Sequence, residues 1–425
     1  MSKIAIIGFG AAGYHAAKEA RKTSSDIYID VYSNTNISPY NPMLTTYYVS
    51  GAIPYNAMFP FGPTEQIAAD LNIRCYENQP VTSLLPAEKK LILSDGTERL
   101  YDRILISTGA SAVVPQIPGA SLPGVFKMRT VQDAVALKKY LETGRCKRGL
   151  VIGASWVGIK VVEDLVSYQV DCTLVDGAPW PFYVATFAET AQRIQQALEA
   201  RNIQVACNQM LSHIQQEADG TLTAVMQNGN HFSADLIAIC VGVRANVDLV
   251  KDSGIRIGCG IQVDQRMRTN YEGIYAAGDC CEALDIQSNQ PRNIGVWLNA
   301  CKQGRVAGAN MAGRHLEFDA NLLVNLGHYL NYDFISIGDI QSCAEDDTVY
   351  EYEDSHYYIR AARSAAGIKC INMIGSANIN GIIKNIFIKS IESLEAALDI
   401  RTCCYLYDQG IPSSFLDFLR GRFDD

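Results

Sequence analysis

The amino-acid sequence predicts an α/β protein with two parallel-sheet domains of the βαβ type, followed by a C-terminal α+β region. The two domains are predicted because a buried apolar run, a glycine-rich turn and an amphipathic helix follow one another from residue 4 and again from residue 150. The C-terminal region is predicted because short alternating segments, typical of antiparallel strands, begin after about residue 318. With 425 residues, the chain is also too long for a single hydrophobic core.

The first glycine-rich turn follows the apolar run 4–7 and reads Gly8-Phe9-Gly10-Ala11-Ala12-Gly13. Glycines at this spacing let the backbone approach a pyrophosphate, and the first amides of the next helix face its phosphates. We expect that helix over residues 11–21 and the second strand over residues 27–32. The pattern predicts a Rossmann-like dinucleotide site made by Gly8, Gly10, Ala11, Ala12 and Gly13.

The second turn follows the apolar run 150–152 and reads Gly153-Ala154-Ser155-Trp156-Val157-Gly158. One such turn is weak evidence, but two in the same strand–turn–helix setting indicate that the chain binds two dinucleotides. The next strand, residues 172–176, ends in Asp176, and no arginine follows in residues 177–180. A carboxylate at this place binds both ribose hydroxyls and repels a 2′-phosphate, so NADH is predicted over NADPH. The residues of this second site are Gly153, Ser155, Trp156, Val157, Gly158 and Asp176.

Apolar periodicity and turn residues predict the remaining elements. The expected strands span residues 73–76, 81–85, 90–93, 101–109, 236–242, 357–362 and 368–374, with a further hairpin near Asn228-Gly229. The expected helices span residues 131–142, 189–200, 296–311 and 391–398.

Composition describes an ordinary globular protein, with 48% hydrophobic and 19% charged residues. The net charge of −9 argues against a nucleic-acid partner. The sequence contains no run of about 18 apolar residues, so no transmembrane helix is expected. A strand that begins at residue 4 leaves no room for a signal peptide, so we expect a cytoplasmic protein.

None of the thirteen cysteines stands in a CxxC motif. The adjacent pairs Cys280-Cys281 and Cys403-Cys404 have poor geometry for a disulfide or a shared metal. We therefore expect reduced thiols, no metal site and no iron–sulfur cluster within the chain. The six histidines, including His15 and His328, are scattered and are expected to be structural.

Further motifs are Thr108-Gly109, Val241-Gly242-Val243-Arg244 and Ala277-Gly278-Asp279. With these and the two glycine turns, the chain resembles the FAD- and NAD(P)-dependent pyridine nucleotide–disulfide oxidoreductase superfamily over about residues 1–315. The branch that it resembles contains the ferredoxin, rubredoxin and nitrite reductases. The resemblance implies a discontinuous FAD-binding domain (1–115 and 247–318), an inserted NAD(H)-binding domain (116–246) and a C-terminal interface or dimerisation-like domain (319–425).

The resemblance also implies roles for residues of the FAD site. Asp279 would bind the ribityl hydroxyls or the pyrophosphate, and the amides at Gly295, Val296 and Trp297 would face the pyrimidine end of the flavin. An acidic residue usually binds the adenosine ribose, but here that position is near Ser33, with Asn34 beside it, so a neutral side chain would take this role; Asp30 lies earlier in the strand. Further cofactor contacts are expected from Thr108, Gly109, Gly242 and Gly278.

Two departures from the family pattern concern the chemistry. Disulfide reductases of this branch carry a redox cysteine where this chain has Met43, and a thioether forms neither thiolate nor disulfide. The nearest cysteine in sequence is Cys75. Lys160 stands where many members have a glutamate near the nicotinamide; it would pair with Glu163 or Asp164, lie close to the flavin, or be an ordinary surface lysine. A milder departure is Arg244-Ala245-Asn246, where Arg-Pro-Asn is usual.

The resemblance therefore implies an NAD(H)-dependent FAD oxidoreductase that exchanges a hydride between nicotinamide and flavin. Without a cysteine relay, electrons would pass to or from an external iron–sulfur protein or subunit. The chain is similar in this respect to the flavoprotein subunits of 2-oxoacid-oxidising complexes, phenylglyoxylate dehydrogenase among them, so an oligomer or a larger complex is expected. The alternatives are an NADH oxidase or peroxidase, and a non-catalytic redox-sensing subunit that binds FAD and NAD.

Overall fold

The computed structural model describes residues 2–329, 332–392 and 398–422. By its internal contacts the chain divides into two compact units. The first unit comprises Met1–Val113, Arg129–Val131 and Val243–Asn321. The second comprises Val114–Met128, Gln132–Gly242 and Leu322–Asp425, so the C-terminal region belongs to the same unit as the second glycine turn.

The first unit is built on a five-stranded parallel sheet in the order β19-β7-β1-β2-β3. Its strands are β1 (Lys3–Ile7), β2 (Tyr28–Tyr32), β3 (Arg74–Tyr76), β7 (Arg103–Ile106) and β19 (Ile274–Ala276). Alternate residues of β1 face opposite ways: Ile4 and Ile6 join the core formed with α1 (Ala11–Thr23) and α7 (Trp297–Met311), and Ala5 and Ile7 join the core on the other face. The glycine turn therefore ends a strand that is buried on both sides.

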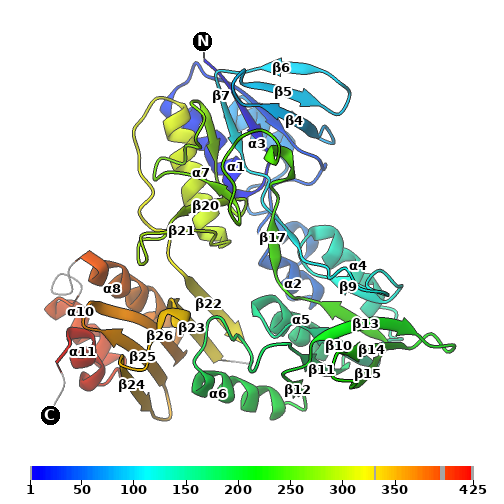
Figure 1. The fold of residues 1–425 in the computed structure, drawn as a ribbon, viewed down its shortest axis with the longest axis vertical. Helices are drawn as coiled ribbons and strands as arrows, with labels where there is room; N and C mark the ends of the chain where they lie inside the picture. Colours follow the sequence, from blue (N-terminus) through cyan, green and yellow to red (C-terminus); the bar gives the residue numbers. More distant parts are fainter. Residues whose placement is uncertain (1, 330–331, 393–397, 423–425) are drawn as a thin grey trace. The chain divides into compact units, whose positions relative to one another are not determined.

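Helices α1 and α7 lie side by side in Figure 1, and glycines of α7 allow their close approach. A Cβ atom at Gly304 would collide with the backbone of Ala12, and one at Gly308 with the backbone of Ala16. The start of α1, which carries the first glycine turn, is thus held against α7.

The shorter elements of the first unit surround this sheet. The helical ones are α2 (Leu44–Val49), η1 (Tyr55–Met58), α3 (Thr64–Leu71) and η2 (Asp248–Val250). The strands are β4 (Val81–Leu85), β5 (Lys90–Leu93), β6 (Glu98–Leu100), β8 (Ala110–Ala112), β17 (Val243–Ala245), β18 (Ile261–Gln262), β20 (Cys281–Leu284) and β21 (Pro291–Arg292).

The second unit contains another five-stranded parallel sheet, in the order β12-β11-β10-β16-β9. Its strands are β9 (Val125–Lys127), β10 (Arg148–Ile152), β11 (Asp171–Val175), β12 (Gln204–Ala206) and β16 (Leu236–Ile239). Its helices are α4 (Val131–Leu141), α5 (Trp156–Ser167) and α6 (Ala188–Glu199). An antiparallel sheet is added by β13 (Leu211–Gln216), β14 (Leu222–Met226) and β15 (His231–Ala234), whose last turn contains the predicted Asn228-Gly229.

The C-terminal part of this unit is an antiparallel sheet in the order β22-β23-β26-β25-β24, with helices beside it (Figure 1). The strands are β22 (Val324–Tyr329), β23 (Tyr332–Gly338), β24 (Thr348–Glu353), β25 (Tyr358–Ser364) and β26 (Gly367–Gly375). The helical elements are η3 (Ile340–Ser342), η4 (Ala377–Ile379), α8 (Asn380–Glu392), α10 (Ile400–Asp408) and α11 (Ser413–Arg420). Strand β22 also contacts α5, which packs against β10 and β11 of the parallel sheet.

The α/β class and both strand–turn–helix units are confirmed, and the four helices expected at 11–21, 131–142, 189–200 and 296–311 form almost at the predicted ends. The helix expected over 391–398 is misplaced: residues 391–392 end α8, residue 398 is not helical, and residues 393–397 lie outside the described part. Among the helices of the described ranges, none is both long and apolar enough to cross a lipid bilayer.

Candidate functional site

The first glycine turn uses its three glycines for two different purposes. Gly8 has φ +96°, and a Cβ atom there would collide with the Ser107 backbone at the end of β7. A Cβ atom at Gly13 would collide with the carbonyl of Gly8. Gly10, in contrast, has no atom within 4 Å of where its Cβ would stand. The fold therefore requires Gly8 and Gly13, whereas Gly10 leaves open space beside the first amides of α1, where a pyrophosphate fits.

Asp279 lies just beyond β19. A Cβ atom added at its neighbour Gly278 would be 3.0 Å from the Ala12 Cβ atom, so this part of the chain lies against the first glycine turn. Its Oδ2 atom accepts a hydrogen bond of 2.5 Å from Nη2 of Arg129, whose Nε atom donates to the Ala110 carbonyl. Arg129 is not predicted from the sequence, since its only local signal is a basic residue just before α4. The ion pair fixes Asp279 and adds a cation at the edge of the site.

Trp297 opens α7, and its indole ring stacks on Phe61 at 6.2 Å. Its Nε1 atom is buried and has no hydrogen-bond partner among the described residues. A buried N–H group without an acceptor is costly, so this atom fits a ligand that supplies one. Gly295 lies next to the Asp279 carboxyl, with 3.4 Å between its added Cβ and Cγ. The backbone of Gly295, just before α7, therefore lies beside the Asp279 carboxyl.

At the end of β2, the Ser33 hydroxyl accepts a hydrogen bond of 3.2 Å from the Thr35 amide. Asp30 is buried and accepts a hydrogen bond of 2.7 Å from the Tyr101 hydroxyl. Asp30 is therefore used inside the domain, and Ser33 and Asn34 are the side chains left at the strand end. Thr108 and Gly109 are bonded to Asn246 through hydrogen bonds of 2.7 to 2.9 Å.

Met43 precedes α2, and 57% of its surface is exposed. Cys75 lies on β3 beside the hydrophobic core of this unit, and burial, together with Glu77 and Glu65, raises its pKa to about 12. Cys75 is therefore a poor source of thiolate.

The second glycine turn repeats the geometry of the first. Gly153 has φ +110°, and its added Cβ would collide with the Cys240 carbonyl at the end of β16; one at Gly158 would collide with the carbonyl of Gly153. Ser155 takes the place that corresponds to Gly10, and its hydroxyl donates a hydrogen bond of 3.1 Å to Cys240. Gly242, with φ +114°, has open space around its added Cβ. Val157 on α5 is 39% exposed.

Asp176 follows β11 and contacts this turn directly. Its Oδ2 atom accepts a hydrogen bond of 2.5 Å from the Ala154 amide, and its Oδ1 atom one of 2.7 Å from the Ala178 amide. An ionised carboxylate has about four acceptor positions, so two remain for ribose hydroxyls.

Trp156 begins α5 and packs in an aromatic cluster, stacked on Phe334 of β23 at 5.2 Å and beside Phe182 and Tyr329. Lys160, one turn along α5, forms an ion pair of 2.6 Å with Glu163, and its Nζ atom lies 5.3 Å from the centre of the Tyr329 ring. Of the positions weighed from the sequence, pairing with Glu163 is the one that the structure shows.

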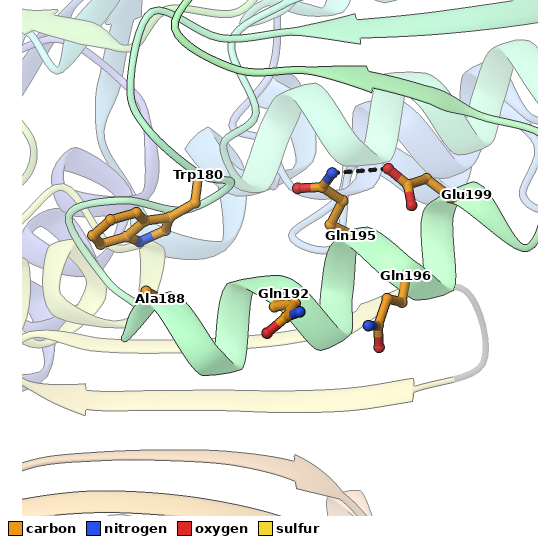
Figure 2. A pocket seen from close by; sticks show the side chains of 6 residues that line it. All are labelled: Trp180, Ala188, Gln192, Gln195, Gln196 and Glu199. Carbon is orange, nitrogen blue, oxygen red and sulfur yellow. Dashed lines mark hydrogen bonds between the residues drawn. The ribbon is translucent and has the colours of Figure 1, made fainter.

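A hollow on the outer face of α6 is drawn in Figure 2. Trp180 comes from the preceding loop, and a hydrogen bond of 2.8 Å joins Gln195 to Glu199 along the helix. The lining residues are Trp180, Ala188, Gln192, Gln195, Gln196 and Glu199, none of which belongs to either glycine turn.

The sequence profile of the pyridine nucleotide-disulphide oxidoreductases matches residues 2–304. The chain belongs to this family. It is 32% identical to an NADH oxidase of Methanocaldococcus jannaschii over 74% of this chain and 70% of the relative. It is 26% identical to the epsilon subunit of the NADH-dependent phenylglyoxylate dehydrogenase of Aromatoleum evansii, over 86% of each chain. An NAD-dependent persulfide reductase from A. fulgidus has the same fold, with a TM-score of 0.86 and 22% identity over 94% of this chain and 79% of that one.

This pyridine nucleotide-disulphide oxidoreductase is an enzyme that uses FAD and NAD(H). When bound, the flavin supplies two-electron exchange with the nicotinamide. The groups that would hold the two nucleotides are the open space at Gly10, the Trp297 indole, which has no partner among the described residues, and the Asp279 and Asp176 carboxylates. These groups would hold and orient the two nucleotides.

Proposed function

We propose that this oxidoreductase moves electrons between NAD(H) and an iron–sulfur protein or subunit. FAD binds to the domain formed by residues 1–115 and 247–318, and NAD(H) to residues 116–246. The observation that carries the proposal is Met43, an exposed thioether at the start of α2, at the place where related disulfide reductases hold a redox cysteine.

Four thiols of the first unit that are buried or partly buried, those of Cys75, Cys280, Cys281 and Cys301, do not compensate for Met43. Burial raises the pKa of Cys75 to about 12 and that of Cys301 to about 11. Burial also raises the pKa of Cys280 and Cys281, which are fully enclosed. A thiol that stays protonated attacks neither a disulfide nor a flavin at useful rates. These thiol pKa values support transfer directly from flavin to an external redox centre.

The relatives support the class of partner. Rubredoxin-NAD(+) reductases of Pseudomonas putida and Ectopseudomonas oleovorans are 26% and 27% identical to this chain over 73% of its length. The epsilon-subunit relative supports membership of a multi-subunit complex. We place this complex in the cytoplasm and assign residues 319–425 as its interface domain. The second candidate, an NADH oxidase, is supported by the 32% identical relative from Methanocaldococcus jannaschii.

A titration of the FAD-loaded protein with NADH under argon tests the proposal. Without a thiol relay, the protein takes up about two electrons per FAD, and no thiolate-to-flavin charge-transfer band forms. Met43→Leu is the matched control and retains this capacity, whereas Met43→Cys introduces a thiol at the same position.

The rates at which different electron acceptors are reduced are then compared at saturating NADH. A ferredoxin or rubredoxin is reduced much faster than oxygen or coenzyme A disulfide if the proposal is correct. A four-electron capacity in the wild-type protein, or disulfide reduction faster than ferredoxin reduction, would contradict it, and fast oxygen consumption would favour the oxidase.

A further inference from the structure

Two cysteines of the C-terminal sheet, far apart in the sequence, come into contact. The sulfur atoms of Cys343 and Cys370 are 3.3 Å apart. Cys370 lies in the middle of β26 and is fully buried, whereas Cys343 follows η3 and is partly exposed. One sulfur is therefore accessible to small molecules and the other lies directly behind it.

The backbone around Cys343 is built to hold this contact. Gly338 ends β23 with φ +83°, and a Cβ atom there would collide with the carbonyl of Lys369. The chain then turns through η3, where the Asp339 carboxylate accepts from the Gln341 amide at 3.1 Å. The Lys369 ammonium donates to the Ser342 carbonyl at 2.9 Å and forms an ion pair of 2.7 Å with Asp347. Cys343 is thus held over Cys370 from both sides.

The two thiols differ in acidity. Hydrogen bonding with Cys370 lowers the pKa of Cys343, and the nearby Lys369 ammonium acts in the same direction, whereas burial, Asp347 and Asp339 oppose the shift. The hydrogen bond to Cys343, together with burial, raises the pKa of Cys370. Cys343 is therefore the better nucleophile.

We propose that Cys343 and Cys370 form an oxidation site that reacts with hydrogen peroxide or another small hydroperoxide and closes to a disulfide. The Cys343 thiolate attacks one peroxide oxygen, the O–O bond breaks, and with one proton the products are a sulfenic acid and water. The Cys370 sulfur then attacks the sulfenic sulfur, loses its own proton, and displaces hydroxide as a second water. Two thiols are oxidised by two electrons, and one peroxide is reduced to two waters. A disulfide is about 2.05 Å long, so the two sulfurs need to approach by about 1.3 Å.

The oxidation site adjoins the segment that supports the second glycine turn. Phe187 packs against the cluster that contains both cysteines, and the Gln341 side chain donates to the Tyr183 carbonyl at 3.1 Å. The amide of Phe182 donates to the Ala154 carbonyl within the turn at 2.9 Å. Closing the disulfide pulls on this segment, so we expect oxidation to change the affinity for NADH by about threefold or more.

Peptide mapping of the FAD-loaded protein tests the oxidation site. The protein is reduced, freed of reductant, treated with hydrogen peroxide and digested with trypsin without reduction. Cleavage at lysine and arginine places Cys343 in the peptide 315–360 and Cys370 in the peptide 370–384. We expect these two peptides to be joined in the wild-type protein and in the control Cys404→Ser, which removes an exposed cysteine of α10.

The single variants separate the two roles. Cys343→Ser abolishes the joined peptide, and Cys370→Ala leaves a sulfenic acid on Cys343 that dimedone traps. The proposal is overturned if the two peptides of the wild-type protein stay separate under conditions in which Cys404 is oxidised. This holds whatever result the variants give. Equal NADH affinity of the reduced and joined forms would overturn the link to the nucleotide segment.

Discussion

Gly10→Ala and Gly13→Ala are the same substitution three residues apart, and the structure predicts opposite outcomes for them. A methyl group at position 10 meets no protein atom within 4 Å, and the backbone there has φ −83°, which alanine adopts freely. A methyl group at position 13 would collide with the Gly8 carbonyl at the strand–helix junction.

The magnitudes follow from this difference. Gly10→Ala leaves the unfolding free energy of the apoprotein within about 0.5 kcal/mol, or raises it slightly through the unfolded chain. Gly13→Ala overpacks the junction and costs about 1–3 kcal/mol. FAD affinity, in contrast, is affected directly by Gly10→Ala. The methyl group at position 10 fills the space of the pyrophosphate and removes about two charge-assisted hydrogen bonds. FAD binding is therefore weakened by about 100-fold, or about 2.7 kcal/mol.

Thermal unfolding of the apoproteins and titration with FAD, followed by quenching of flavin fluorescence, measure the two effects separately. Gly62→Ala would not serve as a control because its φ is +86°, so the wild-type protein is the reference. The reasoning is refuted if the Gly10→Ala apoprotein is as unstable as Gly13→Ala, or if Gly10→Ala binds FAD as tightly as the wild type.

Three further outcomes are expected. Asp176→Asn keeps the acceptor for one backbone amide but loses the charge that repels a 2′-phosphate, so the ratio of kcat/KM for NADH over NADPH falls by about tenfold; an unchanged ratio would contradict this. Burial, aided by Arg305 and Lys18, lowers the pKa of His15 from 6.5 to about 4, so the folded state binds fewer protons than the unfolded chain. The free energy of unfolding therefore falls by about 3 kcal/mol as the pH falls from 6.5 to 4. His15→Gln should make the denaturation midpoint less dependent on pH over this range. Burial and, to a smaller extent, Glu163 raise the pKa of Asp164, so the folded protein loses stability as the pH rises above about 4. Asp164→Asn is therefore expected to raise the free energy of unfolding at pH 7 but not at pH 3, as measured by chemical denaturation.

The parallel sheets and both glycine turns could be predicted because their signals are local. Each central strand is a short run of apolar residues, and the close approach of strand, turn and helix leaves only glycine at Gly8, Gly13, Gly153 and Gly158. Asp176 could be placed for the same reason, since the end of a parallel strand next to the first always borders the turn.

Other features arise from contacts that no local pattern encodes. Arg129 reaches Asp279 across 150 positions, and Cys343 meets Cys370 across 27. The helix α10 was missed although its N-cap was visible in the sequence: Asp399 accepts from the Thr402 amide at 2.7 Å. The helix expected over residues 391–398, immediately before it, and the short length of α10 hid that signal.

The C-terminal sheet holds the segment that leads from the second glycine turn into α6. Asn372, buried in the middle of β26, accepts from the Phe187 amide at 3.1 Å and donates to the Ala185 carbonyl at 3.0 Å. The Ser336 hydroxyl of β23 donates to the same carbonyl at 2.6 Å. The segment that they hold continues to Phe182, whose amide is bonded to the second glycine turn. Because buried amide hydrogen bonds are costly to break, the position of that turn depends on the C-terminal sheet, and a chain ending near residue 315 would lose support for its nicotinamide nucleotide as well as any interface.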